Sequence, residues 1–172
     1  MTYAEALNKQ TLVGAIELMA NGKRLEKSTA ATVMMLKVSL DKANSEFNDK
    51  MKEIVNGLKQ EGFDERQRNY AKMQEINSKV DATEEEKKEA EELEETLEGF
   101  EKELATLNDE VQEAHKKLLK EECNVKSATI SKDDWANIYE VMGVEGNSKL
   151  SIGNEPLSNE QFLAILAASL VA

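Results

Sequence analysis

The sequence predicts an all-α fold: a long antiparallel coiled-coil helical hairpin, with a short N-terminal helix before it and a small C-terminal helical module after it. Three observations support this prediction. The 172-residue chain is 33% charged and only 5% aromatic, which favours an elongated helical protein over a compact globule. Its one proline, Pro156, lies outside the interval from Ser28 to Cys123, which is dominated by helix formers. Apolar residues in that interval recur at alternating spacings of three and four.

This apolar spacing is clearest in the second half of the interval, where it forms an unbroken a/d pattern across four heptads. The pattern, called the seam below, consists of Ala90, Leu93, Leu97, Phe100, Leu104, Leu107, Val111, Ala114 and Leu118. The residues between these positions are mostly charged or polar, so the seam can be buried only against another helix.

A short helix is expected within residues 1–27. Thr2 and Glu5 fit a capping box, in which the two side chains accept hydrogen bonds from amides at the start of a helix. The helix carries one apolar stripe, formed by Leu12, Val13, Ile16 and Met19. Asn21-Gly22 is predicted to end it.

The hairpin is expected over residues 28–123, with its turn near residues 81–83. In the outgoing arm the apolar spacing slips after Phe47, a stutter of the kind that unwinds a coiled coil. Gly57 and Gly62 then favour a bend or break near residue 60.

The return arm is predicted to begin at a capping box formed by Thr83 and Glu86. As one continuous helix of about 39 residues it would be roughly 58 Å long. Antiparallel pairing about residue 81 would place Leu118 near Ala43.

The C-terminal module is expected over residues 124–172. Ser131 fits the cap of a helix that carries Trp135. Residues 143–155 are rich in glycine, asparagine and serine, and they are predicted to form a loop or small hairpin with a short strand at 149–152.

The last helix, capped by Ser158, is apolar on almost every side and must be buried. Two alternatives are open: it folds back on the N-terminal helix and Trp135, or it enters a neighbouring subunit. For the second case, the candidate partner-binding residues are Phe162, Leu163, Leu166, Leu170 and Trp135.

The formal charge of −12 is concentrated in the return arm. Residues 84–122 contain 16 acidic and 6 basic residues, whereas residues 29–80 contain 8 acidic and 9 basic ones. Lysines and arginines of the outgoing arm can therefore neutralise glutamates of the return arm. No cluster of basic residues suits a phosphate backbone, so we expect no direct nucleic-acid binding.

The sequence contains no recognisable catalytic or metal-binding pattern. Cys123 and His115 are the only residues of their types, which excludes an intrachain disulfide and leaves a histidine-based metal site without spaced ligands. The loop at residues 143–149 lacks the lysine position of a phosphate-binding P-loop. We therefore expect no enzymatic activity, and no metal, cofactor or small-molecule ligand.

Membrane insertion and secretion are not expected either. No stretch approaches the roughly 20 apolar residues that span a bilayer, and the N-terminus lacks the charged, apolar and small-residue regions of a secretory signal. We expect a protein that is cytoplasmic when it is synthesised.

Four stretches follow one another in a recognisable order. They are Leu12–Asn21, Ser28–Leu40, an acidic charged hairpin and Leu157–Leu166. This layout resembles small, functionally uncharacterised tailed-phage proteins, which share a short helix, a long helix containing alanine and lysine, a charged hairpin, and a C-terminal helix with a Leu-Ser/Thr-x-x-x-Φ-x-x-Leu pattern. The resemblance implies a virion or assembly component and implies no catalytic residue.

Two functions agree with these observations. The first is a structural or assembly protein that presents a helical hairpin to larger protein partners, in several copies within a phage particle. The alternative is a chaperone or adaptor that holds client proteins through the hairpin or the apolar C-terminal helix.

Overall fold

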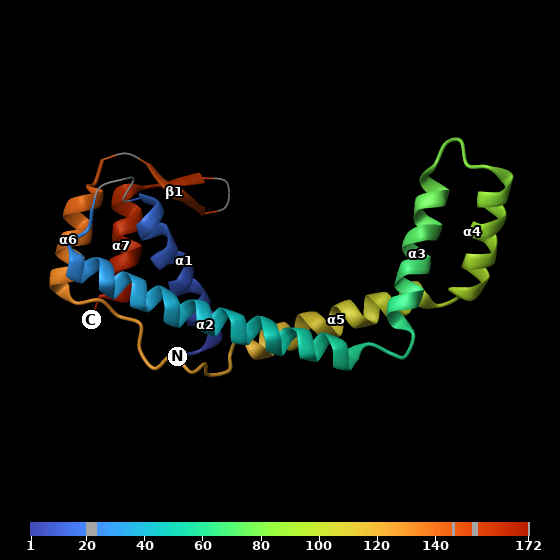
Figure 1. Ribbon diagram of the computed structural model, residues 1–172, viewed down its shortest axis with the longest axis horizontal. Coiled ribbons are helices and arrows are strands. Elements are labelled where there is room, and N and C mark those ends of the chain that lie inside the picture. Colours follow the sequence, from blue (N-terminus) through green and yellow to red (C-terminus); the bar gives the residue numbers. More distant parts are fainter. Residues whose placement is uncertain (20–23, 146, 153–154, 172) are drawn as a thin grey trace. The chain divides into compact units, whose positions relative to one another are not determined.

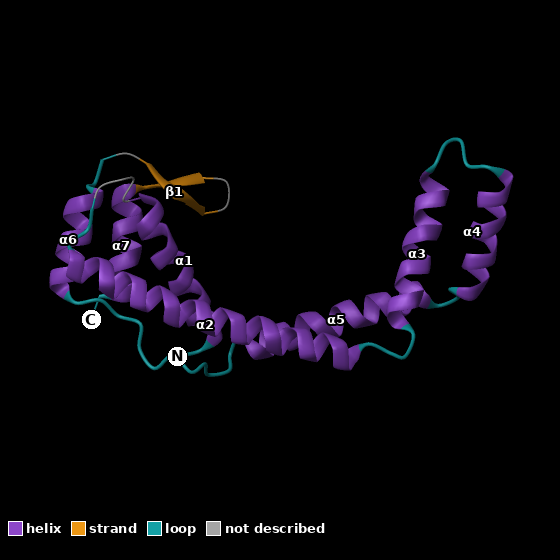
Figure 2. Ribbon diagram, in the orientation of Figure 1, coloured by secondary structure: helices purple, strands orange, loops and turns teal. Residues whose placement is uncertain are grey.

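The computed structural model describes residues 1–19, 24–145, 147–152 and 155–171, and this part of the chain is mostly helical (Figures 1 and 2). The helices are α1 (Tyr3–Met19), α2 (Lys27–Leu58), α3 (Phe63–Ser78), α4 (Glu84–Thr96), α5 (Phe100–Leu118), α6 (Lys132–Met142) and α7 (Asn159–Leu170). Two short strands, β1 (Asn147–Ile152) and β2 (Glu155–Ser158), pair antiparallel. The predicted predominance of helix is confirmed. The predicted helix end at Asn21-Gly22 lies outside the described residues.

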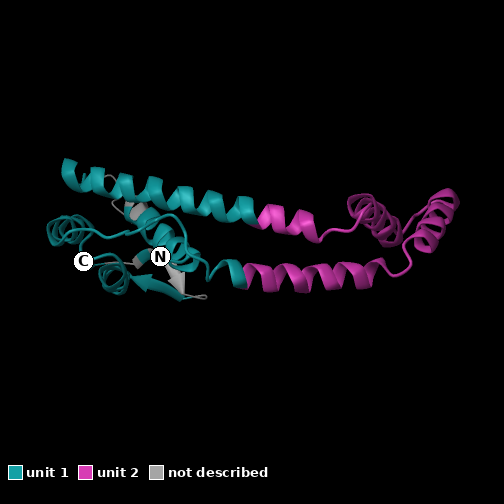
Figure 3. Cartoon of the chain, turned by 90° about the horizontal axis from the view of Figure 1, so that it is seen from below, with its two compact units in different colours: residues 1–50, 117–172 teal, residues 51–116 magenta. Residues whose placement is uncertain are grey.

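The chain forms two compact units (Figure 3). Unit 1 comprises residues 1–50 and 117–172, and unit 2 comprises residues 51–116. This division cuts across the three consecutive segments predicted from the sequence, because the N-terminal helix and the C-terminal module share one core.

The core of unit 1 gathers apolar side chains from α1, the first half of α2, α6, α7 and the segment before α6. Its buried residues are Ala6, Val13, Ala15, Ile16, Val33, Leu40, Ala43, Ala128, Ile130, Ile138, Met142, Phe162, Leu163, Leu166 and Leu170. The strand pair lies against α1 and α7. The amide of Ile130 donates to the carbonyl of Leu170 at 2.7 Å, which attaches the segment before α6 to the end of α7.

The first residues of the chain are attached to the segment that follows α5. The amide of Tyr3 donates to the carbonyl of Glu121 at 3.0 Å, and the amide of Cys123 donates to the carbonyl of Met1 at 2.9 Å. Lys50 lies 5.1 Å from the centre of the Tyr3 ring and 3.3 Å from a Glu121 carboxylate oxygen. Hydrogen bonds to Tyr3 and Glu121 raise the pKa of the Lys50 ammonium group.

Unit 2 contains α3 and α4, which run side by side in opposite directions (Figure 1). The predicted break near residue 60 is present: α2 ends at Leu58, and Gly62, with φ of 75°, precedes α3. The predicted capping box at the turn is also present, because Thr83 and Glu86 each accept a hydrogen bond from the other's backbone amide.

A second break interrupts the return arm, so the prediction of one continuous helix is wrong. The helix α4 ends at Thr96, and Gly99 adopts φ of 81° before α5 begins. Only glycine adopts such a conformation readily. The break lets Phe100 pack against Phe63 and Tyr70, at ring-centre distances of 5.3 and 5.6 Å.

This break also shifts the pairing register. Glu89 pairs with Lys72, whereas Glu101 accepts a hydrogen bond from Tyr70. Between these two contacts the return arm advances by twelve residues and α3 by two, so the pairing register shifts by ten residues. The predicted neighbour of Ala43, Leu118, is therefore displaced, and the side of α2 that carries Ala43 faces residues 124–127 instead.

Candidate functional site

The residues predicted to bind a partner belong to the core of unit 1. Phe162, Leu163, Leu166 and Leu170 are at most 2% exposed, and Trp135 is partly buried against the same core. Of the two alternatives left open by the sequence, the structure has the one in which the last helix folds back within its own chain. Partner binding by these five residues stays a prediction.

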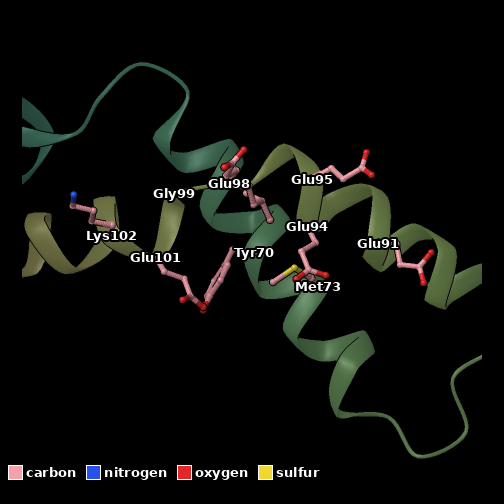
Figure 4. A pocket seen from close by; sticks show the side chains of 10 residues that line it. Tyr70, Met73, Glu91, Glu94, Glu95, Glu98, Gly99, Glu101 and Lys102 are labelled. Atoms are coloured by element: carbon pink, nitrogen blue, oxygen red, sulfur yellow. The ribbon is translucent and has the colours of Figure 1, made fainter.

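A groove with a volume of about 880 Å³ lies in unit 2, where α4 ends and α5 begins (Figure 4). Sequence reasoning missed this groove, which is called the acidic groove below. It is lined by Tyr70 and Met73 of α3, Glu91, Glu94 and Glu95 of α4, the connecting residues Leu97, Glu98 and Gly99, and Glu101 and Lys102 of α5.

The floor of the acidic groove is apolar. Met73 and Leu97 are 7% and 6% exposed, and the half-buried ring of Tyr70 lies beside them. The hydroxyl of Tyr70 donates to a Glu101 carboxylate oxygen at 2.7 Å (Figure 4). This hydrogen bond, together with partial burial, raises the pKa of Tyr70, so the phenol keeps its proton and holds Glu101 in place at neutral pH.

The rim of the acidic groove carries a net negative charge. Five glutamates and one lysine give it a formal charge of −4. Figure 4 shows the carboxylates spread around the groove rather than gathered at one point. Within the described part of the chain, Glu91, Glu94, Glu95 and Glu98 have no cationic partner within 4.0 Å, although other glutamates of unit 2 pair with Lys72, Lys79 or Arg66.

The backbone of α4 adds to this negative charge. The C-terminal end of a helix carries a partial negative charge, which basic side chains usually offset. The last turn of α4 contains no basic residue and instead carries Glu94 and Glu95. Each acidic side chain there costs about 0.3–1 kcal/mol in helix stability. Residues that lower local stability, as these two glutamates do, often occur at binding sites.

The spread of the carboxylates does not suit a single metal ion. In the part of the chain that the structure describes, no group of three or more histidine, cysteine, aspartate or glutamate side chains could hold one. Separated carboxylates around an apolar floor match a ligand that carries several cationic groups and apolar side chains. Lysine- and arginine-containing peptide segments have that chemistry.

A second exposed surface lies on α2 in unit 1. Met34, Met35 and Val38, called the α2 face below, are 65%, 72% and 62% exposed. Their spacing places them together on one side of the helix, away from the buried Val33 and Leu40. The sequence analysis gave these three residues no role, although their apolar side chains lie close together in the sequence.

No family of known proteins matches this chain, and no significant match was found among curated proteins or solved structures. The resemblance to tailed-phage proteins therefore stays a prediction. In the described residues, no helix is both long and apolar enough to cross a membrane.

Proposed function

We propose that this protein is a structural or assembly protein that acts by binding other proteins and catalyses no reaction. In this proposal the antiparallel hairpin, paired along its seam as a coiled coil, presents the acidic groove to a basic, amphipathic segment of a partner. The observation that carries the proposal is the combination of an apolar floor with unpaired carboxylates at one helix break.

The two parts of the groove would have different roles in binding. Burial of the partner's apolar side chains against Met73 and Leu97 supplies affinity, at roughly 25 cal/mol per Å² of apolar surface removed from water. The carboxylates select a basic segment and speed its approach, and salt screens this contribution.

The test uses a fluorescent synthetic helical peptide of leucine and lysine, with the leucines on one face. Fluorescence anisotropy at low salt measures its affinity for the wild-type chain and for a Glu94→Gln/Glu98→Gln variant. We expect roughly tenfold weaker binding to the variant, because each exposed ion pair contributes up to about 1 kcal/mol.

A Glu92→Gln/Asp109→Asn variant is the matched control. Both residues are exposed in unit 2 and lie outside the groove lining, and the change in net charge is the same. The control should bind the peptide within about twofold of the wild type. Equal weakening in the two variants would mean that net charge alone attracts the peptide, and the groove would have no role.

We further propose that the protein is a component of a phage particle. In that assembly several copies of the chain would bind other proteins. This proposal is supported by the order of the elements along the sequence. Detection of the chain in purified particles by mass spectrometry would test it.

A chaperone or adaptor is the second candidate function, and the α2 face favours it. Methionine side chains are flexible and polarisable, and they adapt to many apolar ligands. In this case the free protein should slow the aggregation of an unfolding client, and a Met34→Gln/Met35→Gln variant should lose that effect. A fixed structural role predicts no effect on the client.

A further inference from the structure

We infer that the helix break at Gly99 is a hinge with two conformations, and that a segment bound in the acidic groove selects one of them. In the bent form, which the structure has, α4 and α5 are separate helices that both line the groove. In the straight form they would be one continuous helix. Glu91, Glu95, Glu98 and Lys102 would then lie in one row along that helix instead of lining a groove. The selection by a bound segment rests on the proposed function, whereas the hinge itself does not.

The apolar seam passes through the break without a change of spacing. Leu97, Phe100 and Leu104 are separated by three and four residues, as they would be on one face of a single helix. At the break in the other arm, by contrast, Leu58 and Phe63 are five residues apart, and the stripe of a continuous helix has no such spacing. The return arm is therefore interrupted in the structure but not in its apolar pattern, and its sequence suits a straight helix as well.

The charged residues at the break also suit a continuous helix. Glu94 and Glu95 lie in the last turn of α4, where the partial negative charge of the helix end opposes them. In a longer helix these two residues would lie in its interior, away from that end. Glu98 and Lys102 are four residues apart with the glutamate first, which is the favourable order for an ion pair within a helix. Among the described residues, neither has an oppositely charged partner within 4.0 Å in the bent form.

Opposing contributions set the stability of the bent form. The ring contacts of Phe100 and the hydrogen bond from Tyr70 to Glu101 favour it. Arg66 adds an ion pair with Glu103 at 2.7 Å, but the buried Nε of Arg66 has no hydrogen-bond partner among the described residues. Because contributions of both signs meet at this break, a bound ligand or a single substitution can shift the balance between the two forms.

The surroundings of Gly99 leave room for a change of conformation. A β-carbon added at Gly99 would meet no atom within 4 Å. A second cavity, of about 260 Å³, shares Gly99 and Lys102 with the acidic groove. Close packing therefore does not lock the break, and glycine is required here only for its φ of 81°.

Substitution of Gly99 tests the hinge. Alanine disfavours the left-handed backbone and favours helix, so Gly99→Ala should raise the population of the straight form. Gly99→Asn is the matched control, because asparagine tolerates the left-handed backbone and is a poorer helix former than alanine. Tyr70→Phe is a second test that leaves the backbone of the break unchanged. It removes the hydrogen bond to Glu101 and should shift the population in the same direction as Gly99→Ala, by a smaller amount.

Pulsed electron paramagnetic resonance on the full chain measures the two populations. Spin labels are attached at Glu85→Cys in α4 and Gln112→Cys in α5, both exposed positions, with Cys123→Ser to remove the natural thiol. In one continuous helix these positions would be about 40 Å apart along the axis, and a bend shortens that distance. We expect the shorter distance in the wild type and in Gly99→Asn, and an added population near 40 Å in Gly99→Ala.

The leucine and lysine peptide tests the selection of the bent form. If only the bent form binds, the apparent affinity falls in proportion to the fraction of molecules that are bent. Gly99→Ala should therefore bind the peptide roughly fivefold more weakly, in agreement with the bent fraction that the distances give. A saturating concentration of peptide should restore the shorter distance in this variant. Gly99→Asn should bind within about twofold of the wild type.

The outcomes separate the inference from the proposed function. Unchanged distances in both Gly99→Ala and Tyr70→Phe would overturn the hinge. A population near 40 Å that persists while the peptide is bound would overturn the selection and leave the proposed function standing. A wild type that binds no peptide would overturn the proposed function and the selection with it, and the distances in Gly99→Ala would still decide whether the hinge exists.

Discussion

Unit 1 and unit 2 bury their apolar residues in different ways. Within the described residues, the core of unit 1 contains 15 buried side chains from many segments, whereas that of unit 2 contains seven: Phe63, Met73, Ile76, Ala90, Leu97, Phe100 and Leu107. In unit 1 four helices, α1, α2, α6 and α7, contribute buried side chains to one core. In unit 2 the stability of the helix pair depends on one row of contacts, in which Phe100 touches both Phe63 and Tyr70. The second helix break, at Gly99, lies in the unit with the smaller core.

The polar contacts of unit 2 do not replace a larger core. Lys72, Lys79 and Arg66 each pair with a glutamate of the return arm. In two of these pairs, Lys72 with Glu89 and Lys79 with Glu86, each side chain is 32–53% exposed, and such pairs contribute about 0–1 kcal/mol each. These ion pairs therefore orient α4 relative to α3, but they add little to the stability of unit 2.

The largest expected effect is in unit 1. Replacing Phe162, which is fully buried, by alanine should lower the free energy of unfolding by about 3–5 kcal/mol. Urea denaturation measures the change. Tyr139→Ala is the control, because that ring is 46% exposed and its loss should cost less than about 1 kcal/mol.

The corresponding change in unit 2 is Phe100→Ala. It should cost about 3 kcal/mol and should be confined to unit 2, because this ring has its contacts there. Amide hydrogen exchange resolves the two units. Faster exchange of α3 and α4, with unchanged protection of α7, is the expected pattern. Equal loss of protection in both units would mean that they unfold together as one cooperative body, although their cores are separate.

Replacing two glycines of unit 2 by alanine should change its stability in opposite directions. Gly99→Ala forces a side chain into a left-handed backbone with no nearby atoms to clash with, and it should destabilise unit 2 by about 1–2 kcal/mol. Gly57→Ala lies inside α2, also in open space, and it should stabilise by about 0.5–1 kcal/mol. Thermal unfolding followed by circular dichroism measures both. Stabilisation by both alanines would show that the break at Gly99 is not required.

The smallest expected effect is a loss of stability at acidic pH, through the carboxyl group of Glu86. Hydrogen bonds from Lys79 and from Thr83 lower the pKa of Glu86 from 4.5 to about 2. Because the pKa is lower in the folded chain, this contribution to stability is complete above pH 4.5 and is lost as the pH falls towards 2. Hydrogen exchange in the first turn of α4 should therefore speed up across that interval, after correction for the intrinsic rate.

Glu86→Gln is the matched control for the acid effect. Glutamine can keep the capping box but does not titrate, so the variant should lack this part of the pH dependence. The same pH profile in the two proteins would assign the effect to other carboxylates.

Local features of the fold were predictable, because the residues that determine them are close in sequence. The capping boxes at Thr2, Thr83 and Ser158 are present, and so is the break near residue 60, between the end of α2 and Gly62. Side chains three residues apart satisfy the first amides of a helix whatever lies around it.

The second break and the groove were not predictable in this way. Phe100 keeps the spacing of the seam, so the apolar pattern runs on unchanged although the backbone turns at Gly99. A single glycine within a helical pattern is often tolerated, and only its contacts decide whether it ends the helix. The acidic groove exists because of that turn, and its residues could not be brought together without it.

The order of the two units along the chain has a consequence for synthesis. Unit 2 is one uninterrupted stretch, residues 51–116, whereas unit 1 needs residues from both ends of the chain, including the hydrogen bonds from Tyr3 to Glu121 and from Cys123 to Met1. On the ribosome, unit 2 can therefore fold before α6 and α7, with which α1 shares a core, have been synthesised. The N-terminal helix α1 therefore stays without most of its core neighbours until the residues after 116 have been synthesised.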